Sequence, residues 1–139
     1  MLFVGTHERQ LDDKGRLALP ASFRTHLGEH CYLVMGDDQC VNVIPSDQFE
    51  TMAEQLMNRV ERGEASRQRQ RAVASSATLV SVDKQGRVTV DDRLRTYAGL
   101  RTDDRVVVTG NFRVIEIWAP DRFSAINDEG TSDLAGAGA

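Results

Sequence analysis

The sequence predicts an α+β protein, mainly β, with one pseudo-symmetric domain built from two related halves. A short segment around Gly15-Arg16 recurs around Gly86-Arg87, and 86 minus 15 places the two copies 71 positions apart. Self-similarity at a fixed offset is typical of an internal structural repeat. The chain has 139 residues, so each half is too short to bury a sizeable core alone. The 40% hydrophobic content suits a globular protein whose halves share one core. The aromatic content is only 6%, and small cores of this kind are often completed by self-association.

The repeated segment reads as the end of one strand, a tight turn and the start of a second strand, and we expect the two strands to form a hairpin. Gly15 and Gly86 supply the positive φ that such a turn needs. Asp12 and Asp83, three positions earlier, can accept hydrogen bonds from local backbone N–H groups. These four residues are predicted to support the turns.

The strand after each turn alternates apolar and polar residues, as a half-buried strand does. The apolar positions are Leu17, Leu19, Val88 and Val90. Arg16 and Arg87 begin the outward faces, with Lys14 and Lys84 nearby in the turns. A single Gly-Arg turn would be interpreted as a turn that carries a solvated charge. Its duplication instead favours a pair of exposed loops that bind anions.

Each half is predicted to continue with a short helix and a second hairpin. The helices cover residues 21–27 and 93–98, and each is followed by a glycine that can end it. Asp91 or Asp92 can cap the second of these helices. The second hairpins are predicted at residues 31–44 and 105–118. The repeat unit is therefore a hairpin, a short helix and another hairpin.

Two further helices are predicted between the halves. Ser46 is a candidate cap for the first, whose apolar residues recur at the three- and four-residue spacing of one buried stripe. The stripe contains Phe49, Met52, Ala53, Leu56 and Val60. Gly63 ends this helix, and residues 64–74 form the next one, with Arg67 and Arg71 on one face. We interpret that face as a solvated helix surface rather than a nucleic-acid contact.

The predicted organisation is a first repeat over residues 1–50, interdomain helices over 51–74, a second repeat over 75–126 and a tail over 127–139. The tail consists mostly of Gly, Ala, Ser, Thr and acidic residues, so we expect it to be disordered. A short turn of helix is expected just before it, over residues 120–126.

The net charge of −4 excludes a uniformly basic, nucleic-acid-binding surface. Three acidic residues lie in the tail, which leaves −1 for residues 1–126. Of the 17 basic residues only Lys14 and Lys84 are lysines, so the remaining 15 are arginines. The planar guanidinium fork suits phosphate oxygens or a guanine edge. Contact with nucleic acid is therefore predicted to be local, at the turns.

No combination of residues indicates catalysis, and we predict that the protein is not an enzyme and needs no cofactor. His26, His30, Cys31 and Cys40 lack the paired spacing of a zinc site, so no metal is predicted either. No stretch approaches the length of a membrane span, and the N-terminus lacks the basic lead-in of a signal peptide. We expect a cytoplasmic protein without a membrane partner or a small-molecule substrate.

With both copies considered, residues 1–126 resemble the MraZ family of bacterial transcriptional regulators, which are built from two repeats related to the AbrB DNA-binding unit. The residues that carry the resemblance are Phe3-Val4-Gly5, Leu11-Asp12-Asp13-Lys14-Gly15-Arg16-Leu17, Pro20, Phe23-Arg24, Asp83-Lys84-Gln85-Gly86-Arg87, Tyr97-Ala98-Gly99-Leu100 and Glu116-Ile117-Trp118. The resemblance implies a pseudo-two-fold, swapped-hairpin AbrB-like β-barrel, with short helices between and after the repeats. It also implies closed homo-oligomeric rings in the cytoplasm, associated with the nucleoid. These would bind double-stranded DNA at short tandem G-rich repeats and repress the protein's own division and cell-wall gene cluster.

By the same resemblance, the arginine of the turn reaches DNA, which maps onto Arg16 and, at the equivalent place, onto Arg87. Lys14 maps directly, whereas Gln85 stands at its equivalent in the second turn and Lys84 lies one place earlier. We expect all four basic residues to bind DNA and the first turn to be the stronger. The alternative is an interaction protein, either an antitoxin-like barrel that holds a protein partner or a purely structural ring.

Overall fold

The computed structural model of the protein describes residues 1–136 and is a mixed α+β fold. Its main sheet has six strands, and all neighbouring strands are antiparallel. In spatial order they are β1 (Thr6–Gln10), β7 (Arg105–Asn111), β8 (Val114–Trp118), β4 (Val41–Pro45), β3 (His30–Met35) and β5 (Thr78–Ser81). A separate ribbon pairs β2 (Arg16–Ala18) with β6 (Arg87–Thr89). The helices are α1 (Ala21–Arg24), α2 (Ser46–Glu61), α3 (Arg67–Ser76), α4 (Asp92–Ala98) and α5 (Pro120–Leu134), with a 3₁₀ turn, η1, at Asp37–Gln39.

Strands of the two halves interleave throughout the fold. The first strand, β1, pairs with β7 of the C-terminal half, and β5 of that half pairs with β3 of the N-terminal half. The strands β4 and β8 also pair across the halves. The second hairpins, β3–β4 and β7–β8, form as predicted. Because so many ladder hydrogen bonds cross between them, neither half carries a complete sheet of its own.

The predicted first hairpins are wrong. Although the chain turns between β1 and β2, β1 forms its ladder with β7, and β2 forms its ladder with β6. The equivalent strands β5 and β6 likewise separate, since β5 pairs with β3. Closeness along the chain suggested a hairpin, but each strand instead finds a partner in the other half. The turns therefore join two different layers of the structure.

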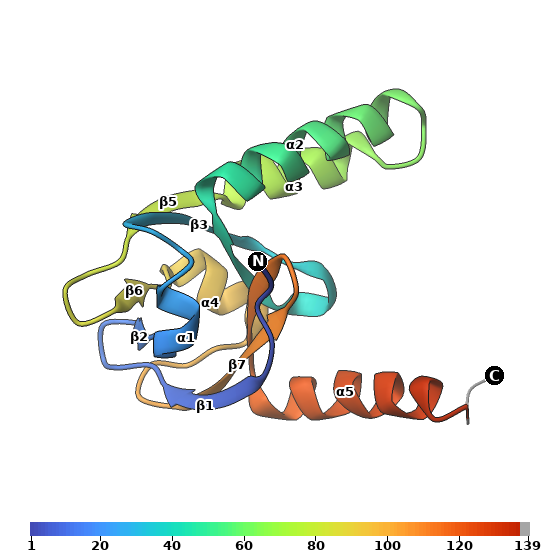
Figure 1. Cartoon of the computed structure of the whole chain (residues 1–139). Helices are drawn as coiled ribbons and strands as arrows, with labels where there is room; N and C mark the ends of the chain where they lie inside the picture. Colours follow the sequence, from blue (N-terminus) through green and yellow to red (C-terminus); the bar gives the residue numbers. More distant parts are fainter. Residues whose placement is uncertain (137–139) are drawn as a thin grey trace.

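The main sheet is open rather than a closed barrel, which corrects the barrel implied by the family resemblance. The strands β1 and β5 are its two ends and do not pair with each other. Figure 1 shows the sheet curling around α1 and α4, with the β2–β6 ribbon lying across one side. Burial thus comes from two layers that pack together, not from a continuous ring of hydrogen bonds.

One core is shared by both halves, as predicted. Leu17 of β2 and Val88 of β6 lie opposite each other and are fully buried. Phe23 of α1 and Leu94 of α4 are buried in the same cluster. Phe3 packs edge-on against Phe23, with 5.7 Å between ring centroids. The inward residues of the ribbon therefore fix its position on the rest of the molecule.

Helices α2 and α3 form an antiparallel arm over one part of the sheet. Phe49 of α2 stacks on Tyr32 of β3 at 4.2 Å, so the predicted apolar stripe does cover the sheet. The predicted cap is wrong, because the Ser46 hydroxyl donates to the His30 carbonyl and no side chain caps α2. Ser66 caps α3 by accepting a hydrogen bond from the Arg69 N–H. The two helices run over Ser46–Glu61 and Arg67–Ser76.

The predicted disorder of the tail is wrong for the residues that α5 contains. This helix runs from Pro120 to Leu134. Phe123 and Ile126 pack against Trp118 and Val107, which anchors the first two turns. Extending an anchored helix is easier than starting one, so the polar residues that follow continue it. Residues 137–139 of the predicted tail lie outside the described residues.

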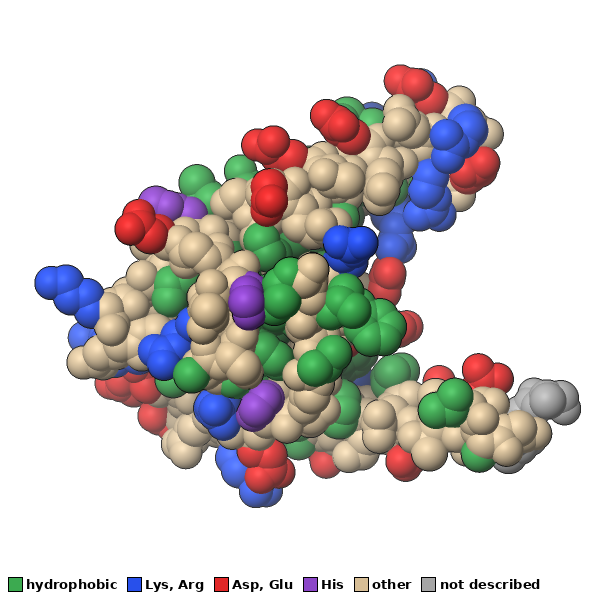
Figure 2. Space-filling view, viewed as in Figure 1, with side chains coloured by type: hydrophobic (Ala, Val, Ile, Leu, Met, Phe, Trp, Pro, Cys, Tyr) green, Lys and Arg blue, Asp and Glu red, His purple; other side chains and the backbone are tan. Residues whose placement is uncertain are grey.

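The α2–α3 arm and α5 lie at the other end of the molecule from the ribbon. Figure 1 shows the α2–α3 arm and α5 projecting to the right, whereas β2, β6 and their turns lie at the left. In Figure 2, Lys and Arg side chains project at that left end, and acidic side chains dot the outer surfaces of α2 and α5. Among residues 1–136 there is no helix whose length and apolar character would let it cross a membrane.

Candidate nucleic-acid interface

The β2–β6 ribbon brings the two predicted arginines onto one surface. Arg16 pairs in register with Thr89, and Ala18 pairs with Arg87. Residues that are paired across strands project to the same face, so all four share the outward face. Arg16 and Arg87 are diagonal neighbours on this face, which places their Cα atoms about 7–8 Å apart. The sequence suggested two separate loops, but the structure joins them in one ribbon.

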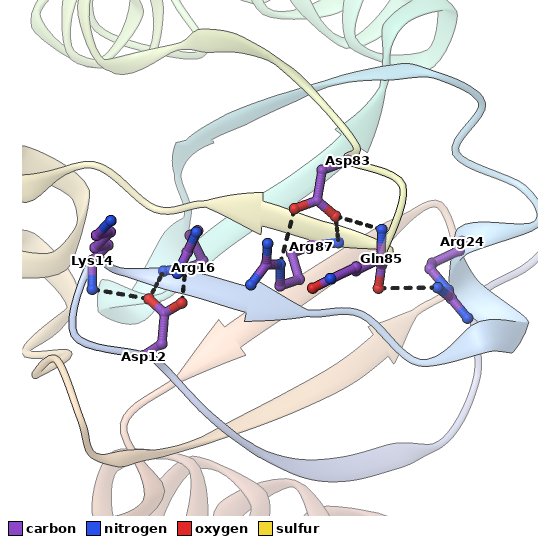
Figure 3. Close-up of polar contacts among 7 residues, drawn as sticks. All are labelled: Asp12, Lys14, Arg16, Arg24, Asp83, Gln85 and Arg87. Carbon is purple, nitrogen blue, oxygen red and sulfur yellow. Dashed lines mark hydrogen bonds and ion pairs between the residues drawn. The ribbon is translucent and has the colours of Figure 1, made fainter.

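In the first turn, Asp12 holds both the backbone and the arginine (Figure 3). One carboxylate oxygen accepts hydrogen bonds from the Lys14 and Arg16 N–H groups at 2.9 and 2.8 Å. The other oxygen accepts from Arg16 Nε at 2.6 Å. The Gly15 N–H closes the turn on the Asp12 carbonyl at 3.1 Å, with a Gly15 φ of 76°. Asp12 therefore fixes the direction in which Arg16 leaves the turn.

The second turn repeats this geometry. One oxygen of Asp83 accepts from the Gln85 and Arg87 N–H groups at 2.9 and 2.8 Å, and the other from Arg87 Nε at 2.9 Å. Gly86 has a φ of 74°, and its N–H donates to the Asp83 carbonyl at 2.9 Å. Both Asp-Gly pairs thus hydrogen-bond within the turns in which the sequence analysis placed them. The sequence does not predict that each carboxylate also holds its arginine.

The surroundings of both aspartates favour the ionised carboxylate. The pKa of Asp12 lies below its usual value, chiefly because the Arg16 N–H donates to it, with help from the Arg16 side chain and the Lys14 N–H. The pKa of Asp83 is lowered for the same reasons, through the Arg87 N–H, the Arg87 side chain and the Gln85 N–H. Partial desolvation opposes the shift in each case. The two ion pairs therefore stay formed at neutral pH.

The terminal nitrogens of both arginines are left for a ligand. Within residues 1–136, the only hydrogen bond of the Arg16 side chain is the one from Nε, and the same holds for Arg87. Both side chains are about a third exposed. Lys14 and Lys84 are exposed in their turns. An arginine held at Nε presents Nη1 and Nη2 as a fixed pair of donors, which matches the two acceptors on a guanine edge or a phosphate.

Each turn is also contacted by an arginine from the other half, which sequence reasoning missed. Arg24 of α1 lies over Gly86, and a Cβ at that glycine would overlap its side chain. Arg95 of α4 lies over Gly15 in the same way. The Leu19 N–H donates to the Gly86 carbonyl at 3.0 Å, and the Val90 N–H to the Gly15 carbonyl at 2.9 Å. The repeat offset could have found the pair, since 24 plus 71 is 95.

The other basic cluster noted in the sequence lies elsewhere. Arg67 and Arg71 are exposed on α3, in the arm that projects away from the ribbon (Figure 1). The structure does not bring them near the two turns. Their separation agrees with the interpretation that they form a solvated helix face.

The two cysteines sit in the core and not in a site. Cys31 and Cys40 are free and buried, and Cys31 lies opposite Pro45 rather than Cys40. Burial raises the pKa of the Cys31 thiol to about 11, and burial with nearby Glu116 raises that of Cys40 further. His26 and His30 are exposed, and within residues 1–136 no cluster of three potential ligands could hold a metal ion.

Comparison with known proteins gives one consistent result. The sequence model of the family described as "MraZ protein, putative antitoxin-like" matches residues 2–71 and again 73–135. The chain is 40% identical to a protein named transcriptional regulator MraZ from Kineococcus radiotolerans, over 92% of this chain and 88% of that one. A protein of the same name from Bifidobacterium longum is 39% identical, over 96% and 90% of the two chains. One from Frankia alni is 43% identical, over 89% and 85%.

Structural similarity adds little to this. The solution structure of PHS018 from Pyrococcus horikoshii aligns with 84% of this chain and 89% of its own, with a TM-score of 0.34 and 15% identity. The sequence matches, by contrast, span nearly the whole chain and fall on both halves separately, in agreement with the repeat seen in the strands. This chain belongs to the MraZ family.

Proposed function

We propose that this protein is a transcriptional regulator that binds double-stranded DNA through the outward face of the β2–β6 ribbon and its two turns. The observation that carries the proposal is the duplicated arrangement in which an aspartate holds an arginine at Nε on a single exposed face. The relatives' shared name, transcriptional regulator MraZ, supports the same conclusion. So does the family resemblance of the residues in both turns.

The shape of the ribbon suits the major groove, which admits a two-stranded β-ribbon as readily as a helix. Arg16 and Arg87 would each donate from Nη1 and Nη2 to the O6 and N7 atoms of a guanine. Ala18 and Thr89 lie between them with short side chains, so the ribbon can approach the base edges closely. The lysines and turn N–H groups would bind phosphates and set the register.

Local charge makes this surface suitable although the whole chain is acidic. Acidic and basic residues balance in Asp12-Asp13-Lys14-Gly15-Arg16, and Asp83-Lys84-Gln85-Gly86-Arg87 carries one net positive charge. The acidic residues of α5 lie at the other end of the molecule (Figure 1). DNA would therefore be repelled from one end and accepted at the other, which orients the protein on it.

We further propose the finer properties that the family resemblance implies. The interleaved strands would be a version of the swapped-hairpin arrangement. The protein would form closed homo-oligomeric rings in the cytoplasm, associated with the nucleoid, and would repress its own division and cell-wall gene cluster at tandem G-rich repeats. A ring presents many ribbons, so its affinity should rise steeply with the number of DNA repeats.

Titration of labelled DNA from upstream of the protein's own gene tests the proposal. We expect the wild type to bind this DNA much more tightly than a scrambled fragment, and the Arg16→Ala/Arg87→Ala double variant to lose that preference. The Arg67→Ala/Arg71→Ala variant is the matched control, because it removes the same number of arginines from α3. A wild-type protein without preference for the upstream DNA would overturn the proposed function.

A second candidate function follows from the family description, which includes the term antitoxin-like. In that case the chain would hold a protein partner, with the apolar groove between α2, α3 and the sheet as a place for it. Ile44, Phe49, Met52, Leu56 and Val73 line this groove. Co-purification of a small partner that is lost on Leu56→Asp substitution would favour this function, as would the absence of autonomous DNA binding.

A further inference from the structure

We propose that Arg24 is a DNA-binding residue of the second turn, where it supplies the phosphate-binding cation that Gln85 lacks. This inference rests on the proposed function. The first turn carries Lys14 at the position where the second has Gln85, since 14 plus 71 is 85. Arg24 belongs to the other half of the chain, yet its guanidinium hydrogen-bonds to the backbone carbonyl of Gln85.

The contact between Arg24 and the second turn is specific. Arg24 Nη1 donates to the Gln85 carbonyl oxygen at 3.3 Å. The side chain then runs along Gly86, where a Cβ would overlap its Cδ, Cζ and Nη1 atoms. Figure 3 shows the guanidinium beside Gln85, on the side of Gln85 away from Asp83 and Arg87. The glycine is therefore needed for its φ of 74° and also for the space that the arginine occupies.

The charge of Arg24 is not neutralised within the described structure. Of the ion pairs among residues 1–136, none includes Arg24. Its only side-chain hydrogen bond there uses Nη1, which leaves Nη2 and Nε, and the residue is partly exposed. With Arg24 added, the second turn gains a further positive charge beside Lys84 and Arg87. A guanidinium fixed in this way is preorganised for a phosphate oxygen.

Arg95, the equivalent residue in the second half, has a different role. Its Nη1 donates to the Val90 carbonyl, and its Nη2 pairs with Asp92 at 3.3 Å. Its side chain is only 18% exposed. The position equivalent to Asp92 in the first half is Ala21, which cannot neutralise Arg24. Arg95 therefore braces the first turn, and that turn carries its own cation, Lys14.

The test is a salt series on DNA binding, with DNA from upstream of the protein's own gene. Each phosphate contact contributes about 0.9 to the slope of log affinity against log salt concentration. We expect Arg24→Gln to lower this slope by roughly that amount per engaged ribbon, because glutamine keeps a donor for the Gln85 carbonyl but loses the charge. Arg24→Lys should keep the wild-type slope. Arg67→Gln is the matched control and should leave the slope unchanged, because Arg67 is exposed on α3, in the arm that projects away from the ribbon.

A second-site change makes the test independent of any damage to the fold. In the Arg24→Gln background, Gln85→Lys restores a cation to the second turn from within its own sequence, as Lys14 provides one in the first. We expect this double variant to regain the wild-type slope. An unchanged slope in folded Arg24→Gln, or no recovery with Gln85→Lys, would overturn the inference. The Arg16→Ala/Arg87→Ala variant in the same assay reports on the proposed function separately, because it tests the base contacts whatever Arg24 does.

Discussion

The two turns of the ribbon share one backbone design but obtain their positive charge differently. In both, an aspartate binds two backbone N–H groups and the Nε of the arginine that follows the glycine. The first turn carries its cation, Lys14, within its own sequence. The second has Gln85 there and is met by Arg24 from the opposite half. The geometry that aims the arginine is thus duplicated closely, whereas the source of the nearby charge differs between the copies.

The same comparison changes the expectation that the first turn is the stronger. That expectation rested on the sequence of each turn alone, in which Lys14 matches the family pattern and Gln85 does not. The first turn also contains the additional acidic residue Asp13, and the arginine behind it is neutralised by Asp92. With Arg24 counted, the second turn is the more positive of the two. We now predict that both turns contribute comparably to DNA affinity.

The largest expected effect is on DNA binding when both ribbon arginines are removed. Each Arg–guanine contact contributes about 1–3 kcal/mol of discrimination, so Arg16→Ala/Arg87→Ala should lose roughly twice that per engaged ribbon. The single variants should fall between wild type and the double variant, by similar amounts. Fluorescence anisotropy with upstream DNA measures all four proteins. A single variant that matches the double one would show that only one turn contacts DNA.

The next largest expected effect is a difference in stability between alanine substitutions at Gly15 and at Gly86. An alanine at Gly15 would meet the Val90 backbone carbonyl at 2.9 Å as well as Arg95, whereas the atoms nearest to one at Gly86 all belong to the Arg24 side chain. Both positions have positive φ, so each substitution should lower the free energy of unfolding by about 1–3 kcal/mol. We expect Gly15→Ala to be the more damaging, because a backbone oxygen cannot move aside. Urea unfolding of the two variants gives the comparison directly, and the reverse order would contradict it.

A smaller effect is expected from the turn lysines. Lys14→Ala and Lys84→Ala should each weaken binding to specific and scrambled DNA alike, since a phosphate contact carries no sequence information. Each should lower the salt slope by about 0.9 per engaged ribbon. Measurement of both affinities across a salt series checks this. A lysine variant that changed the preferred sequence, and not the slope, would instead place that lysine on a base.

The smallest expected effect is on the pH dependence of turn stability, which should be the same in both turns. The pKa values of Asp12 and Asp83 are lowered in the folded protein, so their stabilisation is complete above the ordinary aspartate value of 3.8. It is lost as the pH falls below 3.8 through the lower, folded values. The backbone amides of Arg16 and Arg87 should therefore stay protected from hydrogen exchange at pH 5 and lose this protection as the pH falls below 3.8. Asp12→Asn and Asp83→Asn should each abolish this dependence in one turn and leave it in the other.

The sequence predicts much of the candidate interface because its signals are local. The positive φ of Gly15 and Gly86, the carboxylates that support them and the outward placement of Arg16 and Arg87 all follow from residues a few positions apart. Burial of Leu17 and Val88 confirms the alternation. Strand period and turn chemistry involve few residues, so they can be inferred without knowing where the rest of the chain goes.

The features that were missed depend on contacts between distant segments. The pairing of β2 with β6 joins residues from opposite halves, and no local signal distinguishes it from a hairpin with β1. The contacts of Arg24 and Arg95 have the same origin. The length of α5 depends on Phe123 and Ile126 packing on Trp118, which a composition-based expectation of disorder does not include. Only the repeat offset offered a clue, and it identifies equivalent residues rather than contacting ones.

Methylation interference on the upstream DNA tests most directly whether one ribbon face reads bases with both arginines. The Cα atoms of Arg16 and Arg87 lie about 7–8 Å apart, because the two residues are diagonal neighbours. This distance is roughly two base-pair steps along DNA. We predict that methylation of N7 at two guanines with this spacing blocks wild-type binding. Binding by the Arg16→Ala variant should become insensitive to methylation of one of these guanines, and binding by the Arg87→Ala variant to methylation of the other. An interference pattern that neither substitution alters would contradict the account.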